Sequence, residues 1–193
     1  MNKVITSLLA LTATASIAHA DVIVPKPRPE PRIDCEKVDP NDNVVQLACN
    51  IYHEAGNQAS GGKLAVAIVT LNRLNHQKFP SSVFDVVWEK HYSSRHRRYI
   101  PQFSWTLDGK TDRVVDDRAW QDSVWIANLA WGSFQDPAFG VEVGDLKLET
   151  ATHYHAEYIH PSWARKMKLI AQIGKHLFYC NPRISKCNDP ERK

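Results

Sequence analysis

The chain has 193 residues, of which 43% are hydrophobic, 23% charged and 9% aromatic. This composition is typical of a globular protein with one domain of ordinary size, and it argues against wholesale disorder, collagen and coiled coil. The formal charge of +3, from 24 basic and 21 acidic residues, does not by itself indicate a nucleic-acid-binding protein. The features of the composition that need an explanation are the four cysteines and nine histidines.

Residues 1–20 have the layout of a secretory signal peptide. Lys3 supplies a positive start, residues 4–18 are largely apolar, and Ala18-His19-Ala20 forms a small-x-small cleavage site. The apolar stretch is shorter than the roughly 20 residues that a membrane-spanning helix needs. We therefore predict export to the periplasm, the cell wall or the extracellular space, with no membrane contact after cleavage. An uncleaved N-terminal anchor is the alternative.

Export bears on the cysteines, because an even number in an oxidising compartment favours disulfides. The four are Cys35, Cys49, Cys180 and Cys187, which leaves three pairings open. We prefer the most local pairing, Cys35–Cys49 with Cys180–Cys187, which would join the N-terminal segment to the first helix and close the C-terminal tail. A structural zinc site is the competing interpretation, but no CxxC pair is present.

Four regions are predicted along the chain. The signal peptide is followed by a linker over 21–41, a folded catalytic domain over 42–180 and a polar tail over 181–193. The linker has prolines at alternate positions from Pro25 to Pro31, and their fixed φ angles hold it extended.

Periodic apolar residues predict most elements of the domain. Spacings of three and four residues predict helices from 42 to 55, from 62 to 76 and from 116 to 135, and a short helix is expected over 83–90. The periodicity is lost from 91 to 115, so we predict loops there, with a basic one over 91–98. Residues 152–158 and 176–180 are β-prone and are expected to form a small sheet or hairpin. The predicted fold class is therefore a mainly helical α+β single domain. Three tryptophans are expected to pack its last long helix: Trp120, Trp125 and Trp131.

Glu54 is the first candidate for chemistry. It lies in the sequence Asn-Ile-Tyr-His-Glu-Ala-Gly at 50–56, at the C-terminal end of an apolar helix. Apolar neighbours and the negative end of the helix dipole both favour a protonated carboxyl group. A carboxylic acid that stays neutral near pH 7 can donate a proton to a leaving oxygen. From spacing alone, a surface glutamate at a helix end is the alternative.

Two aromatic and polar stretches are candidates for holding a sugar. They are Gln-Phe-Ser-Trp at 102–105 and Thr-His-Tyr-His-Ala at 152–156. Aromatic rings cover the apolar faces of sugars, while amide and hydroxyl groups bond sugar hydroxyls. On an alternating strand, His153 and His155 would face one side and Tyr154 the other. Core aromatics and core histidines are the alternative interpretation.

A metal site and an anion-binding loop are two further hypotheses. His153 and His155 could supply two zinc ligands and His53 or Glu54 a third, as in zinc hydrolases. However, there is no HExxH motif, and neighbouring helical residues such as His53 and Glu54 point about 100° apart. The basic run over 95–98 could attract an anionic polymer, or it could simply be a solvated loop.

Six short motifs follow one another in an order that resembles the SleB/CwlJ-type cell wall hydrolase family, and the resemblance covers roughly residues 44–179. The motifs are Asn-Ile-Tyr-His-Glu-Ala at 50–55, Gly-Lys-Leu-Ala-Val-Ala at 62–67 with Leu-Asn-Arg at 71–73, Phe-Pro at 79–80, Gln-Phe-Ser-Trp at 102–105, Ala-Thr-His-Tyr-His-Ala at 151–156, and Ile-Gly at 173–174 with His-Leu-Phe-Tyr at 176–179. Two departures lie beside the proposed site. The family usually has Arg-Gly-Glu where this chain has Gly-Asn-Gln at 56–58, and it usually has Gly where this chain has Thr150.

The resemblance implies a lysozyme-like domain that cleaves peptidoglycan between N-acetylmuramic acid and N-acetylglucosamine as a lytic transglycosylase. The family's essential acid, in its Tyr-x-Glu-Ala motif, falls on Glu54. A transglycosylase needs no second carboxylate, because the 6-hydroxyl of muramic acid attacks its own anomeric carbon at high effective concentration.

These inferences give a set of expected site residues. We expect Gln102, Ser104, Tyr154 and His155 to bind sugar and orient Glu54, with Trp105 as either a sugar platform or part of the core. We expect a monomer that needs no metal or cofactor.

Two alternative functions use the same residues. A zinc-dependent N-acetylmuramoyl-L-alanine amidase would use His153 and His155 as ligands. A non-catalytic wall-binding module would hold the glycan through its Trp and Tyr residues without cleaving it. A nucleic-acid partner is disfavoured, because the basic run is short and the net charge small. Peptidoglycan is the expected partner, and the small positive charge would attract an anionic wall.

Overall fold

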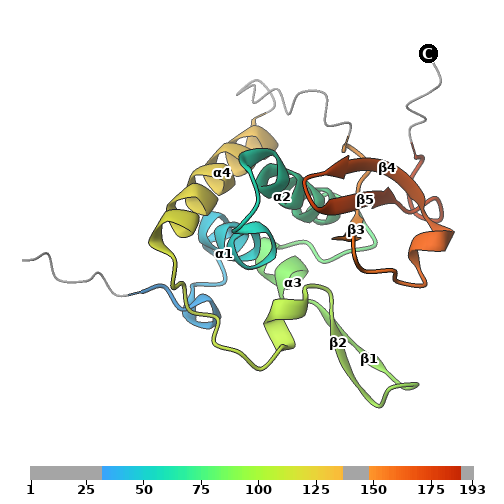
Figure 1. Cartoon of the computed structure of the whole chain (residues 1–193), viewed down its shortest axis with the longest axis horizontal. Coiled ribbons are helices and arrows are strands. Elements are labelled where there is room, and N and C mark those ends of the chain that lie inside the picture. Colours follow the sequence, from blue (N-terminus) through green and yellow to red (C-terminus); the bar gives the residue numbers. More distant parts are fainter. Residues whose placement is uncertain (1–31, 137–147, 188–193) are drawn as a thin grey trace, which may run out of the picture. The chain divides into compact units, whose positions relative to one another are not determined.

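Helices and a small sheet make up most of the described chain (Figure 1). A computed structural model describes residues 32–136 and 148–187. The predicted signal peptide, the linker as far as residue 31 and the last six residues lie outside the described residues. None of the described helices is long and apolar enough to cross a membrane.

The three long helices are α1 (Asn43–Ala55), α2 (Ser60–Leu74) and α4 (Asp117–Gln135). They confirm the helices expected from apolar periodicity. The carboxyl group of Asp42 accepts a hydrogen bond from the backbone N–H of Val45, and Asp116 accepts one in the same way from Ala119. These side chains satisfy free N–H groups at the starts of α1 and α4, which explains where both helices begin.

Helix α3 (Val83–Val87) is shorter than the predicted span of 83–90. Lys90 already belongs to strand β1 (Lys90–Ser93), which pairs antiparallel with β2 (Arg98–Pro101). The loop predicted over 91–98 is therefore right only for the turn at 94–97, because the residues on either side of it form the strands of a β-hairpin. The rings of Tyr92 and Tyr99 are in contact across the two strands, and an aromatic pair of this kind adds to the stability of a hairpin.

A second, three-stranded sheet has the order β3-β5-β4, with both pairs antiparallel. Strands β3 (His153–Ala156) and β5 (His176–Cys180) lie within the two stretches predicted to be β-prone. Strand β4 (Lys168–Ile173) was not predicted, and it lies at the edge of this sheet. Helix and sheet together confirm the mainly helical α+β class.

Two groups of buried apolar residues hold these elements together. One lies among α1, α3 and α4, and it includes Leu47, Ile51 and Ile126. The other lies between α2 and the three-stranded sheet and includes Val69 and Phe178. Tyr154 of β3, one of the expected site residues, packs against both groups, so its side chain is held from two directions.

A buried polar contact links three elements beneath the site. Asn50 of α1 is fully buried, and its amide donates to Thr70 Oγ1 of α2 over 3.0 Å. The indole N–H of Trp105, in the short 3-10 helix η2 (Ser104–Leu107), donates to Asn50 Oδ1 over 3.1 Å. Because all these buried polar groups are partnered, the contact stabilises one relative placement of α1, α2 and η2.

The four cysteines form the preferred pairs, Cys35–Cys49 and Cys180–Cys187. The first joins the 3-10 helix η1 (Cys35–Lys37) to α1, and the second ties the chain after β5 back to that strand. This confirms the most local of the three pairings.

The prediction for the three tryptophans of α4 is right for two of them. Trp120 and Trp131 pack against the core, but Trp125 is 59% exposed. The buried positions of α4 are Ser123, Ile126, Ala127 and Ala130. Trp125 lies about 100° or more around the helix from most of these positions, so it faces away from the core.

Candidate active site

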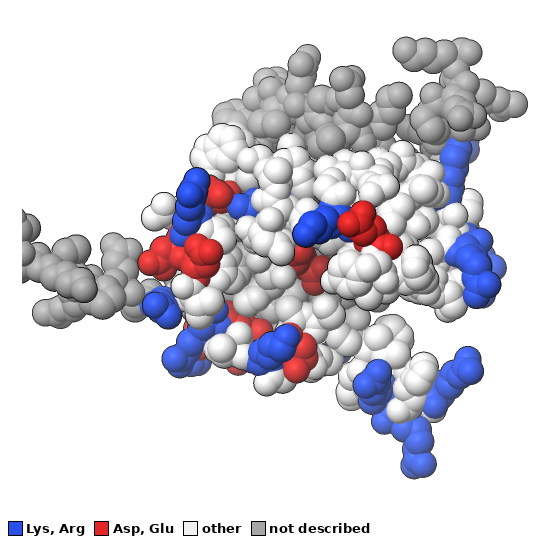
Figure 2. Space-filling view, in the orientation of Figure 1, with Lys and Arg blue, Asp and Glu red and all other residues white. Residues whose placement is uncertain are grey.

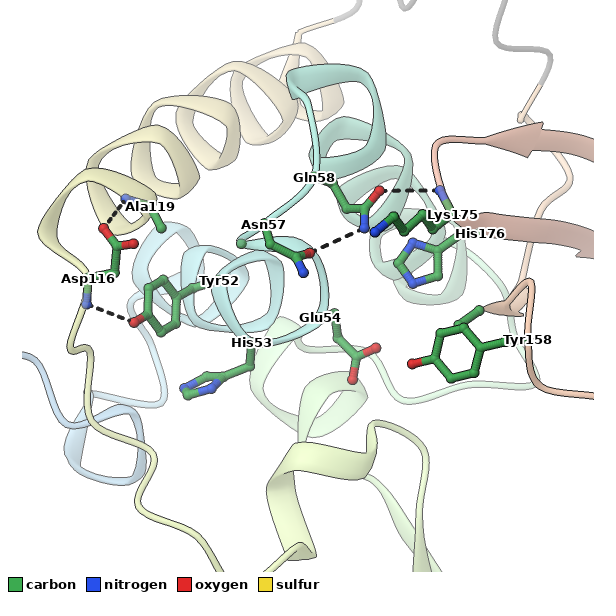
Figure 3. Close-up of a pocket in the computed structure, with 12 residues that line it drawn as sticks. Tyr52, His53, Glu54, Asn57, Gln58, Asp116, Ala119, Tyr158, Lys175 and His176 are labelled. Atoms are coloured by element: carbon green, nitrogen blue, oxygen red, sulfur yellow. Dashed lines mark hydrogen bonds between the residues drawn. The ribbon is translucent and has the colours of Figure 1, made fainter.

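Glu54 lies in the last turn of α1 and lines two neighbouring pockets, one of which is drawn in Figure 3. Both pockets are lined by Glu54 and by the same four other residues: His53, Ala156, Tyr158 and His176. In Figure 3 the carboxyl group of Glu54 points toward the ring of Tyr158. A chain-like ligand could therefore extend from one pocket into the other and pass the carboxyl group of Glu54.

The surroundings of Glu54 favour its protonated form. Burial raises the pKa of the Glu54 carboxyl above its usual value, while the hydrogen bond from Tyr154 and the charge of Arg73 offset only part of that rise. The Tyr154 hydroxyl donates to Glu54 Oε2 over 3.0 Å. A carboxyl group with a raised pKa and an open pocket beside it has the properties of a proton donor.

Tyr154 is held firmly on β3. Its ring makes an edge contact with His176 at 5.2 Å and packs against Phe178 at 5.5 Å between ring centroids. Burial raises the pKa of Tyr154 well above its usual value, so its hydroxyl keeps its proton and remains a donor. The strand therefore fixes both the position and the donor role of this group toward Glu54.

All six predicted site residues line one pocket. Glu54, Gln102, Ser104, Trp105, Tyr154 and His155 surround it together, although they come from three separate parts of the chain. Ser104 is exposed and Gln102 is half-buried, so both can reach a ligand.

Trp105 belongs mainly to the core, which decides between its two expected roles. It is only 6% exposed, its indole N–H is bonded to Asn50, and its ring stacks on His53 at 4.4 Å between centroids.

Arg73 was not predicted as a site residue, although it ends the Leu-Asn-Arg motif at 71–73 that supported the resemblance. It is only 4% exposed, and its Nε donates to the backbone oxygen of Thr152 over 2.8 Å. Its guanidinium group lies over the rings of Phe79 and Phe103, 5.4 and 5.0 Å from their centroids. Arg73 lines the pocket of Glu54 and places a positive charge near the acid.

Tyr158 was also missed. It lines both pockets, and its side chain is 74% exposed. The predicted strand over 152–158 includes it, but β3 ends at Ala156 and Tyr158 lies in the turn that follows. An exposed ring at the pocket edge is suited to stacking on a sugar.

The zinc ligands suggested by the sequence do not come together. His155 uses one ring nitrogen toward the Tyr179 hydroxyl and the other toward the backbone oxygen of Ala156, both at 2.9 Å. His153 contacts Thr152 Oγ1 at 2.9 Å, and burial lowers its pKa to about 4. Within residues 32–136 and 148–187, no three His, Cys, Asp or Glu side chains are grouped to hold a metal ion.

One of the two departures from the family has a structural role. The Oε1 atom of Gln58 accepts a hydrogen bond from the backbone N–H of Lys175 over 3.2 Å, which joins the loop between α1 and α2 to the turn between β4 and β5. Gln58 and Lys175 both line the pocket shown in Figure 3. Gln58 thus helps to shape one wall of the site.

The fold and the site define a small α+β protein with a protonatable carboxyl group between two polar and aromatic pockets. The cell wall hydrolase family matches this sequence over residues 57–179, which is more than half of the chain. The chain belongs to this family, as its motifs predicted. The matched region begins just after Glu54 and includes the other five predicted site residues.

Similar proteins include three spore cortex-lytic enzymes. Those of Oceanobacillus iheyensis and Halalkalibacterium halodurans are each 32% identical, over 139 and 143 residues, and that of Bacillus subtilis is 27% identical over 138 residues. These alignments cover 72%, 73% and 72% of this chain but only 42%, 36% and 37% of the relatives. This chain therefore matches about two fifths of the length of each relative. No solved structure is significantly similar to it.

Proposed function

We propose that this protein cleaves peptidoglycan between N-acetylmuramic acid and N-acetylglucosamine as a lytic transglycosylase. The observation that carries the proposal is the half-buried Glu54 carboxyl, with its raised pKa, between two pockets. Family membership and the similarity to spore cortex-lytic enzymes support a substrate in the cell wall.

The proposed reaction uses Glu54 twice. Its carboxyl group first protonates the glycosidic oxygen, so that the bond to the muramic acid anomeric carbon breaks and N-acetylglucosamine leaves with a new hydroxyl group. The resulting carboxylate then takes the proton of the muramic acid 6-hydroxyl, whose oxygen bonds the anomeric carbon and forms a 1,6-anhydro ring. The Tyr154 hydroxyl and the nearby charge of Arg73 stabilise the carboxylate between these two steps.

The pockets on either side of Glu54 suit sugars on both sides of the cleaved bond. Gln102 and Ser104 offer amide and hydroxyl groups in one pocket, and Asn57 and Gln58 offer amides in the other. Tyr158 lines both pockets and provides an exposed ring for a sugar face.

Asp108 is the carboxylate that would matter if the reaction were hydrolysis instead. Asp108 lines the pocket that holds Glu54, and its Oδ2 atom lies 3.5 Å from the ammonium group of Lys110. An ordinary glycosidase needs a second carboxylate as base or nucleophile, whereas the proposed route does not. We therefore expect the Asp108→Asn variant to keep most of its activity and the same products.

Digestion of purified sacculi, followed by mass spectrometry of the muropeptides, tests the proposal. The wild type should release 1,6-anhydro products, and the Glu54→Gln variant should be slower by about 10²-fold or more, because the general acid is lost. Unchanged thermal unfolding at acidic pH would show that the variant is folded.

Other products would overturn the proposal. If the wild type releases new reducing ends without additional anhydro product, and the Asp108→Asn variant loses this activity, the reaction is hydrolysis. Chelator-sensitive release of peptide stems would mean an amidase. Sacculus binding with no loss of turbidity would mean a non-catalytic wall-binding module.

Export is part of the proposed function, because the substrate lies outside the cytoplasm. The two disulfides support it, since such bonds form and persist in oxidising compartments. N-terminal sequencing of the mature protein should find Asp21 as the first residue, and retention of residues 1–20 would support the anchor instead. Sedimentation should show a monomer.

A further inference from the structure

The β1–β2 hairpin is a basic arm that leaves the domain beside the candidate active site. In Figure 1 it extends away from the helices, and in the same view its basic side chains form a separate blue group in Figure 2. The backbone N–H of Gln102 donates to the oxygen of Glu89 over 2.9 Å and closes the base of the hairpin. Gln102 also lines the pocket of Glu54, so the arm begins at the wall of the site.

Positive charge is concentrated on this hairpin. Residues 90–101 contain Lys90, Arg95, Arg97 and Arg98, all exposed, and no aspartate or glutamate. The rest of the chain then has 20 basic and 21 acidic residues, so the net positive charge of the protein lies on the hairpin. An exposed group of one sign attracts an anionic polymer, and the attraction weakens as salt increases.

Arg97 has a backbone conformation that favours glycine. Its φ angle is 51°, and it is the only non-glycine residue with positive φ among the described residues. A side chain in this region costs up to about 1–2 kcal/mol. Such strained positions are concentrated at functional sites. Arg97 thus keeps a charge at the tip of the arm at a cost to backbone stability.

Two tyrosines form an exposed aromatic pair on the same hairpin. Tyr92 and Tyr99 face each other across the strands with their rings 5.5 Å apart, and they are 57% and 58% exposed. The ammonium group of Lys90 lies 5.8 Å from the centre of the Tyr99 ring. Rings of this kind pack on the apolar faces of sugars, and the neighbouring cations can pair with carboxylates.

We propose that the hairpin is a second binding surface for peptidoglycan, which pairs its arginines with the carboxylates of the peptide stems and its tyrosines with the glycan. This rests on the proposed function, and it adds a surface that retains the polymer while Glu54 acts. The continuity of the arm with the pocket favours this partner over a lipid surface, since one glycan strand can contact both.

Binding to purified sacculi tests the arm independently of cleavage when every protein carries Glu54→Gln. The parent protein carries Glu54→Gln alone. The hairpin variant carries Arg95→Gln, Arg97→Gln and Arg98→Gln in addition, and its binding is compared with that of the parent. Three exposed charge contacts of a few tenths of a kcal/mol to 1 kcal/mol each predict a loss of affinity of about tenfold. The dependence of binding on salt concentration should also become weaker.

A matched variant with Lys78→Gln, Arg118→Gln and Arg183→Gln removes the same charge from exposed positions outside the hairpin. It should bind sacculi within about twofold of the parent. Equal losses in the two variants would overturn the proposal, because net charge alone would then explain the attraction. Near-ultraviolet circular dichroism and thermal unfolding confirm that both variants are folded.

Two further measurements identify the ligand group. Amidation of the sacculus carboxyl groups should weaken binding of the parent to the level at which the hairpin variant binds native sacculi. If amidation leaves binding of the parent unchanged, carboxylates are not the partner of the hairpin. Vesicles of phosphatidylglycerol should not capture the parent. If the vesicles capture the parent but not the hairpin variant, and both proteins bind sacculi equally, the partner of the hairpin is a lipid surface and not peptidoglycan.

The two proposals fail in different ways. If the wild type cleaves sacculi but the hairpin variant binds like the matched control, only the arm is wrong. If the wild type releases no glycan fragments but the binding difference holds, the proposed function is wrong and the hairpin is a wall-binding surface.

Discussion

Glu54 shows how one residue obtains its chemistry from its surroundings. The helix C-terminus and apolar neighbours that the sequence indicated are present, and burial is the largest cause of its raised pKa. Tyr154 and Arg73 act in the opposite direction. The carboxyl group is thus stabilised in both of its protonation states, as a group that first donates a proton and then accepts one requires.

The raised pKa of Glu54 makes stability depend on pH. The folded state binds this proton more tightly than the unfolded state, whose carboxyl titrates near 4.5, so the free energy of unfolding falls as pH rises through the interval above 4.5. The Glu54→Gln variant lacks this dependence. We expect its Tm to exceed that of the wild type at pH 8 and the difference to shrink at pH 4. A difference that does not vary with pH would contradict the assignment.

Tyr154 should shift the pH range of activity. The Tyr154→Phe variant loses the hydrogen bond that lowers the pKa of Glu54, so that pKa rises further and the alkaline limit of activity moves to higher pH. At optimum pH we expect a loss of roughly tenfold, because the carboxylate is less well stabilised.

Rates measured from pH 4 to pH 9 test this shift. The Tyr179→Phe variant is the control, because its hydroxyl contacts His155 and not Glu54. An alkaline limit that moves equally in both variants would show a general structural effect.

At the scale of elements, the turn between β4 and β5 joins the three-stranded sheet to the loop between α1 and α2. Gly174 has a φ angle of 57°, and a Cβ atom there would lie 2.6 Å from Gln58 Oε1. The same oxygen accepts the hydrogen bond from Lys175. Glycine at this position therefore permits both the turn and the close approach of Gln58.

The Gly174→Ala variant should separate these two effects when it is compared with Gly109→Ala. Gly109 also has a positive φ angle, 76°, but a Cβ atom there would meet nothing within 4 Å. Backbone strain of about 1 kcal/mol is expected in both variants, and Gly174→Ala should lose about 1 kcal/mol more because it displaces Gln58. Chemical denaturation measures both losses, and equal losses would mean that the Gln58 contact contributes nothing.

At the scale of the whole molecule, the 3-10 helix η1 is attached to the rest of the domain by the Cys35–Cys49 disulfide and by a hydrogen bond from the backbone N–H of Cys35 to the backbone oxygen of Asp112. Burial and the nearby carboxylates of Glu36, Asp108 and Asp34 raise the pKa of Asp112 to about 6. The ionised carboxyl group of Asp112 therefore lowers the stability of the folded state.

The Asp112→Asn variant should be more stable than the wild type at pH 8. The folded pKa of about 6 exceeds the ordinary value of 3.8, so ionisation of Asp112 destabilises the fold above pH 6, and this cost disappears as pH falls to about 4. After allowance for solvent screening, we expect a gain of about 1 kcal/mol at pH 8 and none at pH 4. The exposed carboxyl of Glu149 provides the control, and a similar gain in Glu149→Gln would contradict the prediction.

The sequence by itself was sufficient for the features that depend on local order. Three long helices follow from apolar residues repeated every three or four positions. The sequence left three cysteine pairings open, and the structure has the most local of them, which was the preferred one. The family followed from the order of six motifs. The six predicted site residues come from separate parts of the chain and line the same pocket, and their roles stay predictions.

Only the tertiary structure decided the features that depend on distant partners. Strand β4 is a strand because β5 pairs with it, and residues 90–101 form a hairpin because β1 and β2 pair with each other. Arg73 and Tyr158 become site residues because α2 and the turn after β3 meet the end of α1. Trp125 is exposed because the core lies on the other side of α4. Local periodicity records which way a side chain faces on its own element, but burial, pKa and pocket shape arise from neighbours that only folding brings together.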